Sequence, residues 1–237
     1  MVENMLFKRN VPINEYIAIK IPTVEEVVDN EQDYYTMVSM LTAMPIDLMV
    51  QLDDMGIDYT TIDEYELFLL LFNGLKGQDT TLVFGDLDLN KFRIASNTEN
   101  GEIVLVDKDN DYVIDRGIYL MIARTLRKIH HLEKNVRKPA NEAAREYLLE
   151  RARTKAKRNR RKMQESQIEP LIIAMVNTEQ FKYDFESTKQ LTIYQFNESV
   201  RQIIKKVDYD NRMFGVYSGT ISAKDLSQND LNWLTNK

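Results

Sequence analysis

A run of basic residues, RARTKAKRNRRK at positions 151–162, constrains the fold of this 237-residue chain more than any other feature. The run contains eight basic residues, no acidic residue and no side chain more apolar than alanine. Charged side chains are almost never fully buried unless they are paired, so this stretch cannot form part of an ordinary hydrophobic core. The sequence therefore predicts a division of the chain here, with a folded part on either side.

Short segments of alternating apolar and polar residues predict strands before the basic run. Residues 14–22, NEYIAIKIP, are typical of a half-buried strand that ends at Pro22. Two further strands are expected at 80–86, TTLVFGD, and at 91–96, KFRIAS. The segments GEIVLV and DYVID, which flank DKDN, predict a β-hairpin because turn-forming residues separate two β-rich arms.

Apolar residues at helical spacing predict helices on both sides of these strands. A capping box of Thr61 and Glu64 favours a buried helix that begins at this point. The spacing also predicts a long helix from Arg116, whose apolar stripe continues through Val136 and stops before Pro139.

A second long helix is expected to begin at Asn141, and its apolar stripe disappears beyond Arg151. Near the C-terminus, Thr192 and Gln195 predict another capping box, in front of an amphipathic helix. The apolar stripe of that helix is formed by Ile193, Phe196, Val200, Ile203, Ile204 and Val207.

These patterns predict an α+β protein in three parts. We expect a strand-containing α+β domain at residues 1–138 and a basic helical connector at 139–165. A small, mainly helical C-terminal domain is expected at 166–237. The length of the chain is sufficient for two small hydrophobic cores, which agrees with this division.

The charge of the chain changes sign along its length. Residues 1–120 carry 23 acidic and 8 basic residues, a net charge of −15, whereas the remaining residues carry a net charge of +9. Such an asymmetry favours either a polyanion site on the basic half or attraction between the two halves or their copies. The chain has no cysteine, and its longest apolar run, LFLLLF at 67–72, is too short to cross a membrane. We therefore expect a cytoplasmic protein with no membrane partner.

Three carboxylates, Asp107, Asp109 and Asp111, have the spacing of the first ligands in a calcium-binding loop. The remaining motif positions do not fit, because Tyr112 stands where the loop needs glycine and Ile118 where it needs glutamate. A solvated hairpin turn is the better explanation of these aspartates.

The two histidines, His130 and His131, point about 100° apart on a helix, so they cannot chelate one metal ion together. A position on the helix surface is the interpretation that we favour. The acidic cluster of Asp53, Asp54 and Asp58 lacks further ligands and is expected to be a solvated loop. With no nucleotide-binding glycine loop either, we predict no catalytic residue, no cofactor and no metal, and hence no enzyme.

The basic run allows two interpretations. As a helix it would place positive charge almost all around its surface, which suits contact with a polyanion. It would equally suit a solvated connector that docks on an acidic protein surface, and the acidic first half supplies such a surface. The candidate contact residues are Arg151, Arg153, Lys155, Lys157, Arg158, Arg160, Arg161 and Lys162.

Three segments resemble proteins of tailed phages and prophages of Gram-positive bacteria: MPIDLMVQLDDMGIDYTTIDEYELFLLLF, IDRGIYLMIARTLRKIHHLEKN and the C-terminal LTIYQFNESVRQIIKKVDYDNRMFGVYSGTISAKDLSQNDLNWL. The segment LTIYQFNESVRQI is similar to the short helices of tail assembly chaperones. Those chaperones bind the tape measure and tail tube proteins before the tail polymerises. The resemblance therefore implies a partner-binding helix, with Ile193, Phe196, Val200, Ile203 and Ile204 as candidate contact residues.

The working hypothesis is a non-enzymatic phage tail or virion assembly protein, a tail assembly chaperone that acts in the host cytoplasm. Its expected partners are tape measure protein, tail tube protein or further copies of the chain. Two alternatives stay open. One is a structural connector that is retained in the virion, and the other is a nucleic-acid-associated protein that uses the basic connector.

Overall fold

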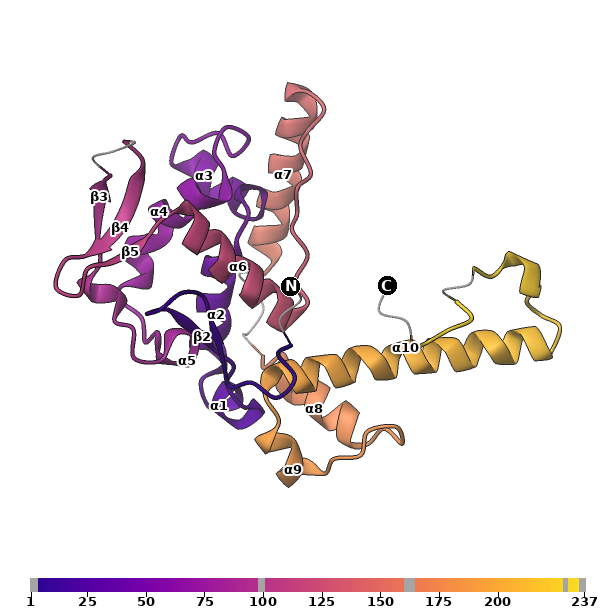
Figure 1. The fold of residues 1–237 in the computed structure, drawn as a ribbon. Coiled ribbons are helices and arrows are strands. Elements are labelled where there is room, and N and C mark those ends of the chain that lie inside the picture. The colour runs from indigo at the N-terminus through magenta and orange to yellow at the C-terminus, as the bar shows by residue number, and fades with distance from the viewer. Residues whose placement is uncertain (1–3, 98–100, 160–164, 228–229, 235–237) are drawn as a thin grey trace.

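The computed structural model describes residues 4–97, 101–159, 165–227 and 230–234. Figure 1 shows a body of short helices and two small sheets, from which the long helix α10 (Ile193–Tyr217) projects. The strands lie in the first half of the chain, and the region after the basic run is helical. The predicted α+β class, with a helical C-terminal region, is therefore confirmed.

The strands form two separate antiparallel sheets. In the first, Val11 pairs with Ile19, and both side chains are buried. In the second, β4 is central and forms with β5 the hairpin that the sequence predicted around DKDN. The strands are β1 (Asn10–Pro12), β2 (Ala18–Lys20), β3 (Arg93–Ser96), β4 (Ile103–Asp107) and β5 (Tyr112–Ile114).

Helices make up most of the described chain. In addition to α10, they are α1 (Val24–Asp29), α2 (Glu31–Thr42), α3 (Met49–Asp54), α4 (Glu64–Leu75), α5 (Thr81–Phe84), α6 (Arg116–His130), α7 (Glu142–Asn159), α8 (Ile168–Val176) and α9 (Phe185–Gln190), with short 3-10 turns at Pro45–Leu48, Leu89–Lys91 and Ala223–Asp225.

The strand predicted at 80–86 is wrong, because this segment contains the single helical turn α5. Val83 and Phe84 are buried in the main core, and Gly85 ends the turn with a positive φ of 61°. A short apolar run does not distinguish a strand from a buried helical turn. Here the helical turn packs its apolar side chains into the core.

The predicted start of α4 is also corrected. Asp63, and not Thr61, is the N-cap: its carboxylate accepts hydrogen bonds from the backbone N–H groups of Tyr65 and Glu66. Glu66 completes the capping box by accepting from the Asp63 N–H. Thr61 lies two residues before this N-cap, and its hydroxyl donates to the Asp58 carbonyl oxygen.

Helix α6 ends earlier than its apolar stripe predicted. His131 adopts a left-handed conformation, with φ of 53°, and its N–H donates to the Arg127 carbonyl oxygen. This cap terminates the helix, so Leu132 and Val136 lie on an extended segment and are 44% and 69% exposed. Helices commonly end at a residue in the left-handed conformation, and this residue is usually glycine.

One main hydrophobic core joins residues from before and after the basic run. Ile21 of the first half, Ile129 of α6, and Ile193 and Phe196 of α10 all belong to it, and each is less than 2% exposed. A second, smaller cluster, formed by Leu52, Tyr59, Leu67 and Leu149, joins α3, α4 and α7.

Hydrogen bonds also connect the predicted N-terminal and C-terminal domains. The Glu31 carboxylate accepts from the N–H groups of Gln167 and Ile168, at 2.6 and 3.1 Å, and so caps the start of α8. The Val24 N–H donates to the Leu191 carbonyl oxygen, and the Ile193 N–H to that of Pro22. The boundaries at 138 and 166 stay predictions, and these contacts show that the parts they separate pack against each other.

Candidate functional site

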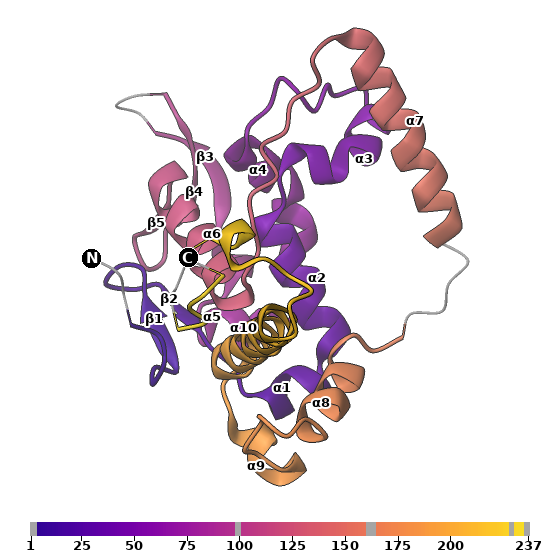
Figure 2. The same ribbon diagram turned by 90° about the vertical axis from the view of Figure 1, so that its right-hand side faces the viewer.

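Helix α7 carries the basic run and lies beside α3 at the edge of the body (Figure 2). It begins as predicted, because the Asn141 side chain accepts a hydrogen bond from the Ala144 N–H. Leu149, 7% exposed, anchors one face of the helix in the smaller core cluster. Beyond this residue the helix continues to Asn159 without a buried apolar side chain.

An ion-pair cluster holds α7 against the acidic end of α3. The Arg153 guanidinium lies 2.6 Å from the Asp53 carboxylate and 2.7 Å from that of Asp54. About two helical turns before it, the Arg145 guanidinium lies 3.8 Å from the Asp58 carboxylate. The prediction of a purely solvated acidic loop is therefore corrected: these carboxylates form the docking surface for the basic helix. The surfaces of α3 and α7 are complementary because their side chains carry opposite charges.

The remaining described cations of the run are exposed to solvent. Arg151, Lys155 and Arg158 are exposed, and their spacing of four and three residues places them on one side of α7. Lys157 is exposed as well. The candidates Arg160, Arg161 and Lys162 lie outside the described residues. Arg153 therefore differs from the other described cations of the run: it forms ion pairs within the chain, whereas they are exposed to solvent.

The first turns of α10 belong to the core. The Thr192 hydroxyl accepts from the Gln195 N–H at 3.1 Å, and the Gln195 side chain accepts from the Thr192 N–H at 2.9 Å, which confirms the predicted capping box. Ile193 and Phe196 are fully buried, and Val200 and Ile203 are partly buried against the same core. Of the five apolar residues predicted to bind a partner, these four therefore pack within the chain.

The second part of α10 projects from the body as an arm (Figure 1), and the apolar side chains of the stripe become exposed there. Ile204 is 57% exposed, Val207 38%, Phe214 75% and Tyr217 83%. Ile204, Val207 and Phe214 lie on one side of the helix, because residues three, four and seven apart share a face. We call these three residues the arm stripe. Large apolar side chains grouped on a surface commonly mark a protein interaction site.

The C-terminal tail packs along part of the arm. Ile221 packs on Gly215 so closely that a Cβ atom at this glycine would lie 2.5 Å from the Ile221 Cδ1 atom. Arg212 forms an ion pair with Asp230, and the Lys206 ammonium lies 5.7 Å from the centre of the Trp233 ring. These contacts fix the tail along α10 and leave the arm stripe open.

The two histidines are not simply surface residues. His130 is half-buried against α2, where its Nε2 atom lies 2.9 Å from the Tyr34 hydroxyl oxygen. Burial lowers the pKa of His130 to about 4, since the charged imidazolium loses its hydration. His131 lies 3.7 Å from Glu198 of α10, and burial lowers its pKa as well. The interpretation as a helix-surface residue is therefore corrected for His130. Its partner, Tyr34, is 96 residues away in the sequence, so the local residue spacing could not predict the contact.

The three aspartates of the predicted calcium-like spacing form a hairpin turn. The Asp107 carboxylate is buried and accepts hydrogen bonds from the Asp109 N–H, at 3.0 Å, and the Asn110 side-chain amide, at 2.7 Å. Asp107 therefore braces the turn from inside and is not solvated as expected, whereas Asp109 and Asp111 are exposed. Within the described parts of the chain, His, Asp and Glu side chains do not gather in groups of three as a metal site would need.

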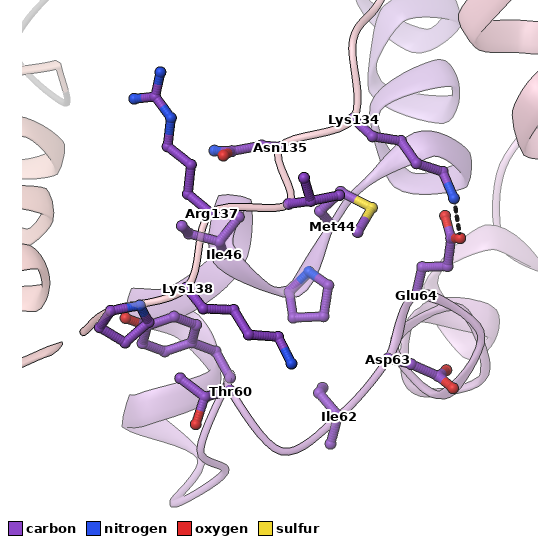
Figure 3. A pocket seen from close by; sticks show the side chains of 14 residues that line it. Met44, Ile46, Thr60, Ile62, Asp63, Glu64, Lys134, Asn135, Arg137 and Lys138 are labelled. Carbon is purple, nitrogen blue, oxygen red and sulfur yellow. Dashed lines mark hydrogen bonds and ion pairs between the residues drawn. The ribbon is translucent and has the colours of Figure 1, made fainter. Parts of the chain in front are cut away.

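A pocket of about 310 Å³ lies under the extended segment that follows α6 (Figure 3). Ile46 and Ile62 contribute an apolar floor, and the Lys134 side chain reaches down to pair with the Glu64 carboxylate. Arg127 also pairs with Glu64, at 3.0 Å. Because two cations engage this carboxylate, the pocket suits contact with a small apolar group better than proton transfer.

Among the helices in the described ranges, none is long and apolar enough to cross a membrane. The family model described as YomV second domain matches residues 157–237, which include the end of α7, α8, α9 and the whole α10 arm. This similarity indicates a phage-related protein. The comparisons with curated proteins and with solved structures gave no match.

Proposed function

We propose that this chain is a non-enzymatic assembly protein of a phage tail or virion, and that it acts as a tail assembly chaperone in the host cytoplasm. The observation that carries the proposal is the arm stripe, which is apolar, exposed and placed on a helix that extends away from the body. A chaperone of this kind needs an accessible apolar surface, because the hydrophobic effect drives most protein association.

The position of the arm supports the same function. Its base is fixed by two fully buried side chains, Ile193 and Phe196, each of which stabilises the packed state by roughly 1.5–3 kcal/mol. The region of similarity to the YomV second domain contains the whole arm. The proposed partners are the tape measure protein, the tail tube protein or further copies of this chain.

The test is co-purification of the full chain with tape measure and tail tube proteins from a related phage. We expect a stable complex that is weakened at least about tenfold by Ile204→Asp combined with Phe214→Asp, because both changes place a charge in an apolar contact. Tyr147→Asp is the matched control, since Tyr147 is an aromatic residue of α7 that is 63% exposed. A complex that is insensitive to the arm variants would refute the proposed role of the arm.

A structural connector is distinguished from a chaperone by its presence in the finished particle. Mass spectrometry of purified virions is the measurement. A transient chaperone is expected to be absent or present in traces, whereas abundant copies would favour the structural connector.

Nucleic-acid binding through α7 is the second candidate function, and the exposed cations Arg151, Lys155 and Arg158 favour it. Affinity that depends on phosphate contacts falls steeply as the salt concentration rises. Fluorescence anisotropy with labelled duplex and single-stranded DNA at two salt concentrations is the test. Tight binding at the higher salt, lost when these three residues are changed to alanine, would promote this function above the first.

A further inference from the structure

Helix α7 carries a line of four exposed side chains, Tyr147, Arg151, Lys155 and Arg158. Tyr147 precedes the basic run and is 63% exposed. Successive residues of an α-helix are rotated by about 100°, so the spacing of four, four and three residues places all of them within an arc of about 80°. With a rise of about 1.5 Å per residue, the line extends for roughly 16 Å along the helix. We call these four residues the basic strip.

The basic strip lies on the solvent side of α7. Leu149, which packs in the smaller core cluster, and Arg153, which pairs with Asp53, each lie about 160° from the centre of the strip. Figure 2 shows α7 at the edge of the molecule, with the body on one side of it. The side of the helix that bears the strip is therefore accessible along its length.

The positive charge of the basic strip is available to an anionic partner. Between Tyr147 and Arg158 the sequence contains one acidic residue, Glu150, and it is rotated by about 100° from the centre of the strip. In the described chain, the ion pairs of α7 are formed by Arg145 and Arg153, and not by the three cations of the strip. A surface with one sign of charge attracts a ligand of the opposite sign.

We propose that the basic strip binds single-stranded nucleic acid, with phosphates on Arg151, Lys155 and Arg158 and one base stacked on the Tyr147 ring. The inference rests on the second candidate function, nucleic-acid binding, and it specifies the form of the ligand and a contact residue outside the basic run. Proteins that bind single strands combine a row of cations with aromatic side chains on which bases stack.

Tyr147 favours a single strand over a duplex. The bases of a duplex are already stacked on each other, so duplex DNA would contact the strip through its phosphates. A single strand exposes its bases, and stacking on an aromatic ring then adds to the phosphate contacts. The ring therefore increases the affinity for the single strand alone.

The small apolar area of the strip favours nucleic acid over an acidic protein. The hydrophobic effect drives most protein association. In the described chain, Tyr147 is the one large apolar residue of α7 that is exposed. Such a surface fits a partner that binds through repeated charges and ring stacking.

The experiment measures binding to the full chain by fluorescence anisotropy at two salt concentrations. The probes are labelled oligodeoxythymidylate and oligouridylate of about 15 nucleotides, a DNA duplex of the same length and a polyglutamate peptide. We expect the better single strand to bind at least about fivefold more tightly than the duplex or the peptide, because one stacked base contributes about this factor or more. The tighter of the two single strands identifies the ligand as DNA or RNA.

Three variants test the residues of the strip. Tyr147→Ala is expected to weaken single-strand binding about tenfold and to leave duplex binding unchanged, whereas Tyr147→Phe retains the ring and should keep the parent affinity. The third variant changes Arg151, Lys155 and Arg158 together to alanine. It should reduce the slope of log affinity against log salt by about 2, because each phosphate contact contributes roughly 0.7 for a single strand.

Two controls match these variants. Changing Lys108, Lys182 and Lys224 together to alanine alters the net charge equally at exposed positions outside α7, and it should leave the salt slope close to that of the parent. Tyr217→Ala removes an aromatic ring that is 83% exposed on α10, and it should not affect binding. All of the changed side chains are exposed, so circular dichroism is expected to show the parent helix content.

Each outcome is decisive. Equal affinity for single strand and duplex, single-strand binding that Tyr147→Ala does not weaken, or tighter binding of the polyglutamate peptide would overturn the inference. If single strand and duplex bind through the three cations and independently of Tyr147, nucleic-acid binding stands and the single-strand inference alone fails. If no oligonucleotide binds, the second candidate function fails as well, and the assembly role of the arm is still decided by the tail proteins.

Discussion

Arg153 of α7 donates a hydrogen bond to the Asp53 carboxylate at 2.6 Å, across a separation of 100 residues in the sequence. The contact joins the basic run to the acidic first half of the chain. Arg153 and Asp53 keep 39% and 36% of their side-chain surface exposed. Water and salt therefore screen the pair, and its effect is on the position of α7 more than on global stability.

The first prediction concerns this docking contact. Arg153→Gln is expected to speed hydrogen exchange of the α7 amides, because the helix then keeps only Leu149 as a buried anchor. The midpoint of global unfolding should hardly change. Hydrogen–deuterium exchange measured by mass spectrometry checks the first statement and urea unfolding checks the second, with Arg151→Gln as control. Equal exchange in the two variants would show that the ion pair does not hold the helix.

The second prediction concerns the division of the chain. Limited trypsin digestion is expected to cut between Arg151 and Lys162, where the sequence offers many sites. The two fragments should nevertheless elute together on size exclusion, since Phe196 and Ile129 share one core and the Asn197 side chain donates to the Ile129 carbonyl oxygen. Fragments that separate and stay folded would support independent domains instead.

The third prediction tests the helix cap at the base of the arm. Thr192 is 4% exposed, and its hydroxyl caps α10, so Thr192→Ala should lower stability by about 1 kcal/mol. Thr192→Ser retains the hydroxyl and should lose less. Urea unfolding of the full chain provides the comparison. Identical midpoints for the alanine and serine variants would mean that the cap contributes nothing.

The fourth prediction is a pH dependence that arises from His130. Its pKa is about 4 in the folded chain and about 6.5 when unfolded, so the unfolded state binds more protons between these values. Stability is therefore complete above pH 6.5 and falls as the pH decreases toward 4, by up to about 3 kcal/mol. His130→Gln should flatten this dependence in urea titrations at pH 7 and pH 5. A variant with the same slope as the parent would exclude His130 as the cause.

Local sequence signals determined several features of this protein. The alternation in NEYIAIKIP and the turn residues DKDN predicted β2 and the β4–β5 hairpin, and the Thr192 box predicted the start of α10. These signals succeed because a cap, a turn or a periodic stripe acts over a few residues of the same segment.

Only the tertiary structure decided the rest. Three contacts join residues that are 96 to 136 positions apart in the sequence: Arg153 with Asp53, His130 with Tyr34, and Glu31 with the start of α8. No local pattern encodes such pairs. The stripe of α10 looks uniform in the sequence, yet Phe196 is buried and Phe214 is exposed. An amphipathic pattern indicates that one face of a helix can be buried. The packing of the other elements decides which part of that face is covered and which part stays exposed to a partner.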